Sequence, residues 1–550
     1  MSPRGGAATS LNPHTQQHVR QPSKIAKVHR RGHHRRRLSS QPPAARATMG
    51  AEPEPVPVRP ASVVLVPFPA QGHVSPMLRL ARALAARGVA ATVAVPDFVH
   101  RRIVGGSGAG VDLAPIDSDV PDDGDGEPPG FASFAHAMEH HMPAQLEGML
   151  RRRGAACLVV DVLASWAVPV AARCGVPAVG FWTAMLATYR VVGAIPELID
   201  KGLITDAGIP TSTKRLNNGE AAKANRGLQI GDSLTVLPAE LELSTAELPW
   251  LVGDAACQKS RFAFWLRTMD RARSLRAILV NTFPGEASAA AAAGKQQRVH
   301  PSPDLHILQV GPLPSSGFFD FDRARADLHD DGALSKNNPS MWQADETCMA
   351  WLEQQRAGSV VYVTFGSWVA PLGRDEIGEL ALGLAAAGRP FLWALKDEPA
   401  WRGGLPAGYA AAVAGRGKIV AWAPQEDVLR HRAVGCYVTH CGWNSTLEAV
   451  QHGVPLLCYP VSGDQFINCA YIVKMWGIGI RLGSTEKAVV EDCIKRVMDG
   501  EEGRRLQKKV NELKERVMTP GEARSTAKRN LGSFVNAIKT DDPVLGLLSL

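Results

Sequence analysis

Long apolar runs are missing from this 550-residue sequence. A membrane-spanning helix needs about 18 or more consecutive apolar residues, and no stretch of the sequence approaches that length. The most apolar region, Cys157–Tyr189, is interrupted by Asp161 and Arg173, so we interpret it as two buried strands flanking a helix. The N-terminus also lacks the apolar core of a secretory signal peptide. Membrane-spanning and secreted classes of protein are therefore disfavoured.

Paired cysteines are missing as well. The chain has nine cysteines, an odd number, and no two of them form a CxxC motif. Small secreted domains stapled by disulfides use even, regularly spaced sets. The pattern therefore favours reduced thiols and a cytoplasmic location.

Acidic residues are missing from the first 48 positions, which carry ten Lys and Arg residues. Removing those ten charges from the formal net charge of +8 leaves −2 for the remainder, so no nucleic-acid surface is indicated there. We expect residues 1–60 to form a disordered basic extension. Three interpretations stay open: an organelle transit peptide, a nuclear or nucleic-acid patch at residues 29–37, or an upstream extension without function before a working start at Met49.

From Ser62 onward, β-branched runs alternate with Ala- and Leu-rich helical stretches, which is typical of α/β proteins with parallel sheets. Two Rossmann-like halves are expected, with ligands in the crevice beyond the carboxyl ends of the strands. The strands are predicted at residues 62–68, 89–95, 157–162, 177–182, 277–283 and 306–312 in the first half, and at 359–367, 390–395, 418–424, 434–440, 455–460 and 478–482 in the second.

The segment Trp422–Gln465 carries the most specific pattern. Its run VGCYVTHC predicts a buried strand and GWNSTLEAV the helix that follows. We expect Gly442 to allow a tight turn, and the side chains of Asn444, Ser445 and Thr446 to supply a cap and hydroxyls. The free N–H groups of the first helical turn would then form a cradle for a diphosphate.

The words WAPQ, HCGWNSTLE, GVP and DQ follow one another in this segment at unbroken spacing, and it resembles the signature box of the plant family 1 UDP-glycosyltransferases. The resemblance extends over roughly residues 60 to 530 and includes TFGSWVAPLG and RPFLWAL. It implies a GT-B fold, an α/β architecture of two Rossmann-like domains facing each other across a cleft. The boundaries that we expect are an acceptor-binding domain at 61–313, a linker at 314–345, a UDP-sugar-binding domain at 346–525, and a C-terminal helix and tail at 526–550 that return to the first domain.

His73 and Asp161 are the candidate catalytic residues. His73 stands in VPFPAQGHVSP, where a strand ends and a helix begins, and a neutral imidazole there could accept a proton from a hydroxyl. From the residues alone, a lone histidine after a glycine is more often a structural residue at a helix start than a catalytic one. The resemblance implies that His73 is the base and that Asp161, at the end of CLVVD, orients it.

The resemblance also implies the donor site. Trp422 would stack on the uracil and Ala423 would hold the base edge through its backbone. The ribose partners would be Gln425 and Glu448. The remaining contacts are to the diphosphate (His440, Asn444, Ser445), to the sugar (Trp443, Asp464, Gln465 and, from the first domain, Thr183), and to the leaving-group charge (Ser367). Gln465 favours UDP-glucose over other UDP-sugars.

Two further motifs suggest metals. His136, Glu139 and His140 match the HxxEH pattern of some zinc hydrolases, but we expect a polar helix near the acceptor pocket. Asp117 to Asp119 and Asp123 to Asp125 resemble the DxD of metal-dependent glycosyltransferases, but they stand in an acidic, Gly- and Pro-rich stretch typical of a solvated loop. No metal ligand is predicted.

The sequence therefore predicts an inverting, metal-independent, UDP-glucose-dependent O-glucosyltransferase. UDP-glucose would be a co-substrate rather than a cofactor, and the acceptor a lipophilic flavonoid, phenolic, terpenoid or hormone. We expect a monomer without nucleic-acid or membrane partners. The alternatives are a transferase that uses another UDP-sugar, a catalytically silent nucleotide-sugar or small-molecule binding protein of the same fold, and, more remotely, a zinc hydrolase.

Overall fold

The structure is a computed structural model. It describes residues 61–103, 110–120, 131–211, 237, 241, 243–286, 305–314, 340–367, 372–519 and 521–540. The basic extension and most of the expected linker lie outside these residues. The domain boundaries given above remain predictions.

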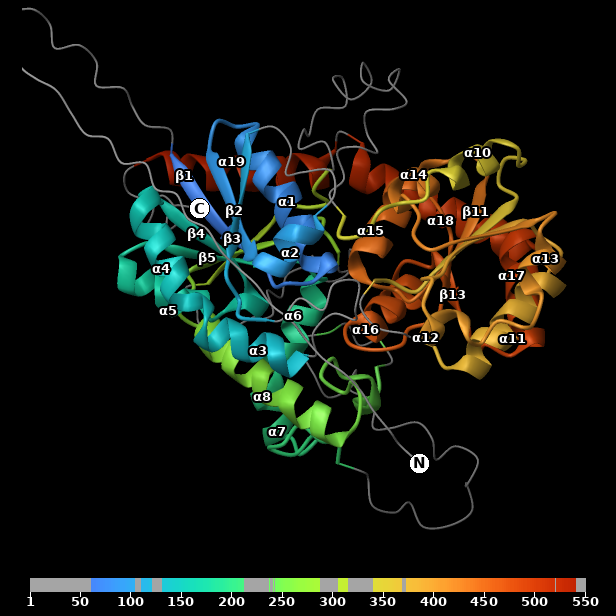
Figure 1. Cartoon of the computed structure of the whole chain (residues 1–550), viewed down its shortest axis with the longest axis horizontal. Helices are drawn as coiled ribbons and strands as arrows, with labels where there is room; N and C mark the ends of the chain where they lie inside the picture. Colours follow the sequence, from blue (N-terminus) through green and yellow to red (C-terminus); the bar gives the residue numbers. More distant parts are fainter. Residues whose placement is uncertain are drawn as a thin grey trace, which may run out of the picture. The chain divides into compact units, whose positions relative to one another are not determined.

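Two parallel sheets organise the described chain (Figure 1). The first has seven strands in the order β3-β2-β1-β4-β5-β6-β7. Their bounds are β1 Ser62–Val66, β2 Ala90–Pro96, β3 Val111–Ile116, β4 Cys157–Asp161, β5 Ala178–Trp182, β6 Ala277–Val280 and β7 His306–Gln309. The second has six strands in the order β10-β9-β8-β11-β12-β13. Their bounds are β8 Val360–Thr364, β9 Phe391–Ala394, β10 Gly417–Val420, β11 Val434–Thr439, β12 Leu456–Cys458 and β13 Gly479–Arg481.

In the described parts of the chain, helices connect most pairs of successive strands, as parallel pairing requires. With the first sheet they are α1 Gln71–Ala85, α2 Asp97–Arg102, α3 Phe131–His140, α4 Met142–Arg153, α5 Ala167–Cys174, α6 Leu186–Gly193, α7 Ile195–Asp200 and α8 Ala255–Ala272. With the second they are α10 Thr347–Glu353, α11 Arg374–Ala386, α12 Pro399–Arg402, α13 Tyr409–Val413, α14 Gln425–Arg430, α15 Trp443–His452, α16 Gln465–Ala470, α17 Lys487–Met498 and α18 Glu501–Met518. Among the described helices, none combines the length and apolarity needed to cross a bilayer.

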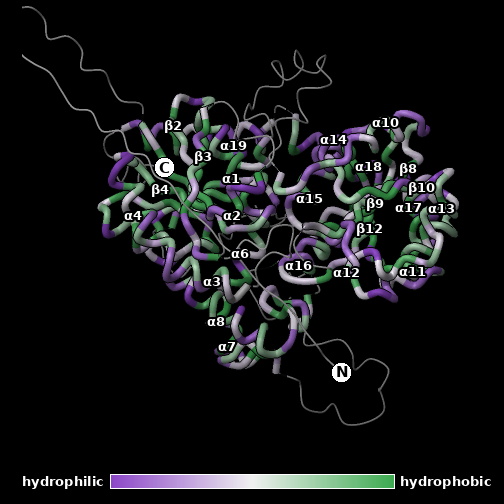
Figure 2. The backbone as a smooth tube through the Cα atoms, in the orientation of Figure 1, coloured by the Kyte–Doolittle hydropathy of each residue, from purple (hydrophilic) through white to green (hydrophobic). Residues whose placement is uncertain are grey.

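Burial explains why the strand predictions succeeded. The central strands are buried along their whole length, as in VVYVT of β8, because helices cover both faces of a parallel sheet. Figure 2 shows the strands mostly in the hydrophobic colour and the polar residues mostly on helices and loops. All twelve predicted strands are present, each within a few residues of its expected bounds.

Strand β3 was missed. Its sequence, VDLAPI, has a polar residue and Pro115, and only part of it is buried. It lies at the edge of the first sheet, where it pairs only with β2. An edge strand tolerates proline because one side of its backbone needs no ladder hydrogen bond.

The last helix, α19 (Glu522–Lys539), contacts the first sheet rather than the second. Its Asn530 amide donates to the carbonyl of Gln309 at the end of β7, and Lys539 donates to the carbonyl of Arg87 after α1. In Figure 1 the red α19 lies beside the blue elements that open the fold.

Candidate active site

Each sheet has one point at which the strand order reverses direction. In the first sheet this point lies between β1 and β4, and in the second between β8 and β11. Ligands of open parallel sheets bind beyond the carboxyl ends of the strands at such points. A cavity of about 1210 Å³ lies there, lined by residues that follow all four strands. Each of the donor-site residues proposed from the sequence lines it, as does His73, whereas Asp161 lies behind His73.

His73 is held by two partners on one ring nitrogen. Its Nδ1 lies 2.7 Å from a carboxylate oxygen of Asp161, the last residue of β4, and 2.9 Å from the hydroxyl of Thr183 after β5. The other Asp161 oxygen accepts the backbone N–H of Leu163 at 2.9 Å, which fixes the carboxylate. Because an ionised carboxylate only accepts hydrogen bonds, the Nδ1 position carries the proton and Nε2 is left with its lone pair. Asp161 is 1% exposed and His73 22%, so a buried acid orients a base that borders the cavity.

The turn between β11 and α15 differs from the expectation for Gly442. Gly442 has an ordinary φ of −59°, and the left-handed residue is Cys441, with φ 67°. Glycine is needed at 442 for space, because a Cβ there would lie 2.4 Å from Nε2 of His440. The glycine therefore permits close approach of the backbone to the His440 ring.

The expected side-chain cap of α15 is wrong, since no side chain caps its N-terminus. The amide of Asn444 instead donates to the carbonyl of Gly72, next to His73, at 2.7 Å. The Ser445 hydroxyl accepts from Gln425, and the Thr446 hydroxyl donates to the carbonyl of Gly442. The N–H groups of the first turn therefore keep their capacity to bind an anion, and the positive end of the helix dipole reinforces it.

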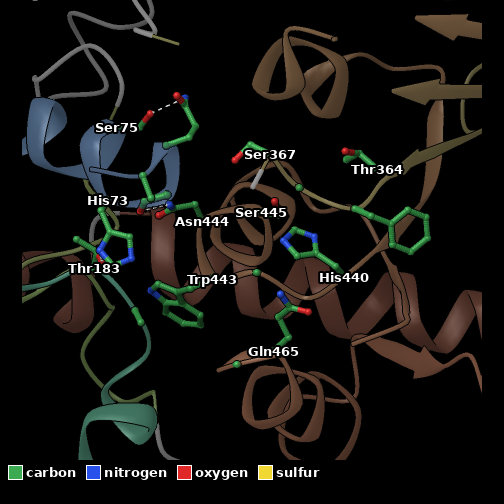
Figure 3. A pocket seen from close by; sticks show the side chains of 18 of the residues that line it. His73, Ser75, Thr183, Thr364, Ser367, His440, Trp443, Asn444, Ser445 and Gln465 are labelled. Carbon is green, nitrogen blue, oxygen red and sulfur yellow. Dashed lines mark hydrogen bonds between the residues drawn. The ribbon is translucent and has the colours of Figure 1, made fainter. Parts of the chain in front are cut away.

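His440 follows β11 and lines the cavity together with Ser445 at the start of α15 (Figure 3). Burial lowers the pKa of its imidazole to about 4, so the ring is neutral near pH 7. Its Nδ1 is buried without a hydrogen-bond partner among the described residues. A neutral imidazole can donate one N–H to a phosphate oxygen, but it adds no full positive charge.

Glu448 on α15 is fixed by residues from both halves of the chain. Its carboxylate accepts from Arg79 of α1 at 2.9 Å and from Gln425 of α14 at 2.8 Å. The Gln425 carbonyl in turn accepts from the Tyr437 hydroxyl at 3.1 Å. Burial raises the pKa of Glu448, and the positive charge of Arg79 opposes that shift. Arg79 also donates to Glu426 at 3.2 Å, so one buried cation serves two carboxylates. No sequence motif pointed to Arg79.

Trp422 borders the cavity with one indole face already covered. Trp342 stacks on it with ring centroids 4.9 Å apart and planes 26° apart, and the ammonium of Lys396 lies 5.1 Å from the Trp342 ring. This separation leaves no room for a base between the two indoles. A uracil stacked on Trp422 must therefore use the opposite face or displace Trp342. No motif in the sequence pointed to Trp342, which precedes the second sheet.

Asp464 and Gln465 lie where α16 begins, with Asp464 as its N-cap residue. The Gln465 carbonyl accepts the backbone N–H groups of Val461 and Ser462 at 2.8 and 2.9 Å, which leaves its NH₂ group to donate. Burial raises the pKa of Asp464, while the amide of Asn468 donates to it at 3.0 Å.

Trp443 uses its side chain to join the two halves. Its indole N–H donates to the carbonyl of Asn281 at 2.8 Å, and its ring packs near Phe283 and Trp476. The side chain is 4% exposed, so it behaves as a core aromatic although the residue lines the cavity. Its indole N–H is therefore not available to a sugar.

Comparisons with known proteins match both halves. A family described as UDP-glucoronosyl and UDP-glucosyl transferase matches residues 319–515, and a family described as glycosyltransferase, N-terminal domain, matches residues 59–118. UDP-glycosyltransferase 82A1 of Arabidopsis thaliana is 41% identical over 490 residues, which cover 86% of this chain and 98% of that protein. The DIMBOA UDP-glucosyltransferase BX8 of Zea mays is 36% identical, with 82% of this chain and 93% of that protein covered.

This chain belongs to the plant family 1 UDP-glycosyltransferases. Its structure is similar to that of Os79 from O. sativa in complex with UDP, with a TM-score of 0.68, 26% identity, and coverage of 86% of this chain and 100% of the other. It is also similar to a UDP-glucosyltransferase from Polygonum tinctorium capable of glucosylating indoxyl, with a TM-score of 0.66, 25% identity, and coverage of 88% and 100%. The predicted GT-B architecture is confirmed.

The first half of the chain lines its side of the cavity with several large apolar side chains. Helix α8 supplies Phe264, Trp265 and Arg261 to the cavity, and Phe68 lies 5.2 Å from the His73 ring. The sequence analysis placed the helix that carries His136, Glu139 and His140 near the acceptor pocket, but none of the residues that line this cavity comes from α3.

The HxxEH motif is occupied by structural contacts. Glu139 forms a two-pronged ion pair with Arg271 at 2.7 and 2.6 Å, so its carboxylate is committed to α8. The rings of His136 and His140 lie with their centroids 4.6 Å apart and their planes tilted by 43°. Among the described residues, they belong to no group of three potential metal ligands. This arrangement argues against a zinc hydrolase. Asp123 and Asp125 lie outside the described residues, and Asp117 accepts the backbone N–H of Asp119 within a turn.

Proposed function

We propose that this transferase moves glucose from UDP-glucose to a hydroxyl group of a lipophilic small molecule, with inversion at the anomeric carbon. The observation that carries the proposal is the position of the His73–Asp161 pair. A base with its lone pair on Nε2 borders the same cavity as the uncapped N-terminus of α15.

The reaction is a single displacement. Nε2 of His73 takes the acceptor proton as the acceptor oxygen attacks the anomeric carbon, and the bond from that carbon to the diphosphate oxygen breaks. Asp161 stabilises the imidazolium that results. A positioned base of this kind contributes ~10²–10⁴-fold to the rate. The negative charge that develops on UDP is stabilised by the backbone N–H groups of Trp443, Asn444 and Ser445. The neutral imidazole of His440 is a further donor.

The donor assignments are those that the family resemblance implies, and they are supported by the position of these residues in the lining of one cavity. Trp422 and Ala423 would hold the uracil, and Gln425 and Glu448 the ribose. The sugar would contact Asp464, Thr183 and the NH₂ group of Gln465, while Ser367 would contact the diphosphate. Gln465 supports glucose as the sugar. Preferred use of UDP-galactose, UDP-glucuronate or UDP-rhamnose in a competition assay would contradict that assignment.

The acceptor is proposed to be flat and largely apolar, because Phe68, Phe264 and Trp265 supply the surface beside His73. The relatives support a small molecule: one is a DIMBOA glucosyltransferase and another a (R)-mandelonitrile beta-glucosyltransferase from Prunus dulcis. Flavonoids, phenolics, terpenoids and hormones are the classes to screen.

Helix and side-chain donors provide the charge stabilisation that a metal would otherwise supply, so we propose a metal-independent reaction without a cofactor. Activity should persist in EDTA. A monomer in the cytoplasm is the accompanying proposal, tested by light scattering and by microscopy of a tagged chain.

The experiment is a screen of hydroxylated acceptors with UDP-glucose, read by mass spectrometry. A product one hexose heavier, with a β linkage by NMR, is expected. A protein that binds UDP but neither transfers nor hydrolyses the sugar would instead be the silent binding protein. The intact His73–Asp161 pair argues against that alternative.

A further inference from the structure

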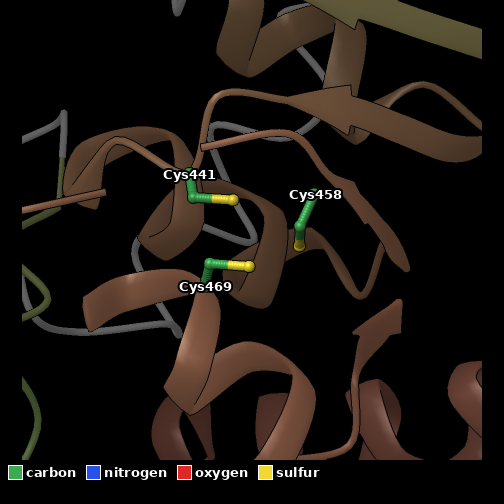
Figure 4. A group of neighbouring side chains, drawn as sticks. All are labelled: Cys441, Cys458 and Cys469. Carbon is green, nitrogen blue, oxygen red and sulfur yellow. The ribbon is translucent and has the colours of Figure 1, made fainter. Parts of the chain in front are cut away.

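Three buried cysteines converge behind the donor site, outside the machinery described so far (Figure 4). They are Cys441, Cys458 and Cys469, and their sulfur atoms all lie within 4.8 Å of one another. Their exposed fractions are 0%, 0% and 2%, and each is a free thiol. They come from three separate segments: the turn after β11, the end of β12, and α16.

The turn that carries Cys441 is held in a specific conformation. Cys441 is one of two residues other than glycine with positive φ in the described chain. Its N–H donates to the Thr439 hydroxyl at 3.1 Å, and its carbonyl accepts from the buried amide of Asn468 at 2.9 Å. Asn468 precedes Cys469, so this hydrogen bond holds two of the three thiol-bearing segments together.

We propose that Cys441, Cys458 and Cys469 form a binding site for a single thiophilic d¹⁰ metal ion, with Cu(I) as the ion of best fit. Metal–sulfur bonds of about 2.3 Å place three sulfurs about 4 Å apart, which is compatible with sulfur atoms that all lie within 4.8 Å of one another. Cu(I) favours soft thiolate ligands. Structural zinc takes four ligands, and among the described residues the group contains only these three.

The protons and charges can be counted when Cu(I) binds to the three thiols. Cu(I) displaces the protons of two thiols, which leave to solvent, and the third sulfur donates a lone pair. The complex then carries one net negative charge. The N-terminus of α15, whose helix dipole favours negative charge, begins two residues after Cys441.

Metal binding would act on the donor site, a step that rests on the proposed function. Cys441 adjoins Gly442 and the first turn of α15, Cys458 leads into the loop that ends at Asp464, and Cys469 lies one turn after Gln465. Tightening the three sulfurs onto one ion therefore restrains each segment that would hold the diphosphate and the sugar. We infer a site at which a soft metal inhibits the enzyme, rather than one that the reaction needs.

The test titrates fully reduced, metal-free protein with Cu(I) under anaerobic conditions, against bicinchoninate as the competing chelator. The variants are Cys458→Ser and Cys469→Ser, which spare the turn at Cys441. Cys348→Ser is the matched control, because Cys348 is also fully buried but belongs to α10, outside the cluster. Circular dichroism and melting temperature identify any variant that does not fold.

We expect one tightly bound Cu(I) per chain in the wild type and in Cys348→Ser, with affinity lower by at least ~100-fold in either cluster variant, since even partners beyond the metal's direct ligands alter affinity ~10–100-fold. Equal affinity in folded cluster variants would overturn the site, as would the absence of a tight equivalent in the wild type. The two proposals fail separately. A chain that binds one Cu(I) but transfers no glucose would support the metal site and contradict the proposed function. A chain that transfers glucose but binds no Cu(I) tightly would support the proposed function and contradict the metal site. If both hold, Cu(I) raises the KM for UDP-glucose in the wild type and leaves it unchanged in Cys458→Ser.

Discussion

At the scale of single residues, the site depends on which nitrogen of His73 carries its proton. Asp161 and Thr183 both approach Nδ1, and among the described residues no hydrogen bond to Nε2 is present. The tautomer is therefore set by a buried carboxylate, and the reactive lone pair faces the cavity. The same logic assigns His440 a different role, because burial keeps its ring neutral and, among the described residues, no acid forms a hydrogen bond with its Nδ1.

Replacing Asp161 with Asn should lower kcat by ~10²–10⁴-fold, because an amide allows the wrong His73 tautomer and cannot stabilise the imidazolium. The dissociation constant for UDP, measured by calorimetry, should stay the same. Asp97→Asn is the control, since Asp97 binds Ser118 in the same half of the chain and lies away from the cavity. Equal losses in the two variants would show a general structural effect.

Trp342 offers a second prediction at this scale. Trp342→Ala should raise the KM for UDP-glucose by roughly 2–10-fold, because Trp422 loses a stacking partner worth ~0.5–1.5 kcal/mol. Trp342→Phe should retain most of the affinity. A lower KM in the alanine variant would mean that Trp342 occupies the position of the base and must leave before the donor binds.

At the scale of elements, the N-termini of two helices meet across the halves of the chain. The start of α1 presents Gly72 and His73, and the start of α15 presents Asn444, whose amide bonds the Gly72 carbonyl. Arg79, about two turns after Gly72 in α1, donates to Glu448, about one turn after Asn444 in α15. The base and the diphosphate cradle are thus aligned by contacts between the same two helices.

Arg79→Met should destabilise the protein by ~3–5 kcal/mol, because it removes the cation that Glu448 faces in the protein interior and leaves that carboxylate buried. Glu426 keeps its ion pair with Arg430. It should also raise the KM for UDP-glucose, since burial would then protonate Glu448 and remove its acceptor capacity for the ribose. Adding Glu426→Gln should recover part of the stability. Urea unfolding and steady-state kinetics of the single and double variants measure both effects, and a single variant as stable as wild type would refute this account of the ion pair.

At the scale of the whole molecule, two buried histidines make the folded state sensitive to acid. Burial lowers the pKa of both His440 and His452 to about 4, below the ordinary value of 6.5. The unfolded chain therefore binds more protons between these two values, so stability present above pH 6.5 is lost as the pH falls toward 4. Each histidine contributes at most about 3 kcal/mol to that loss.

His452→Gln isolates this effect outside the proposed donor site. The melting temperature of the variant should fall less than that of the wild type between pH 7.5 and pH 4.5. His140→Gln, at an exposed position, should follow the wild type. Parallel curves for all three proteins would contradict a neutral, buried His452.

Much of this arrangement was predictable from the sequence. Buried parallel strands are continuous apolar runs, and the box from Trp422 to Gln465 is one unbroken strand-turn-helix pattern, so both were predicted. Strand β3 was not predicted, because an edge strand is only partly buried and its run of apolar residues is interrupted. The roles of Arg79 and Trp342 were not predicted. They come from contacts with Glu448 and Trp422, which are distant in the sequence, and no local spacing encodes such contacts. The prediction of a side-chain cap for α15 was wrong for the same reason, since the Asn444 amide donates to the carbonyl of Gly72 in α1.

The most direct measurement is a comparison of wild-type enzyme and His73→Ala with UDP-glucose and one acceptor from the screen, in which glucoside formation and UDP affinity are measured on the same preparations. The account predicts that the variant forms glucoside at least ~10²-fold more slowly while its dissociation constant for UDP stays within about twofold of wild type, since His73 lies in the other half of the chain from the residues proposed to hold the nucleotide. Near-normal turnover in the folded variant would contradict the assignment of His73 as the base.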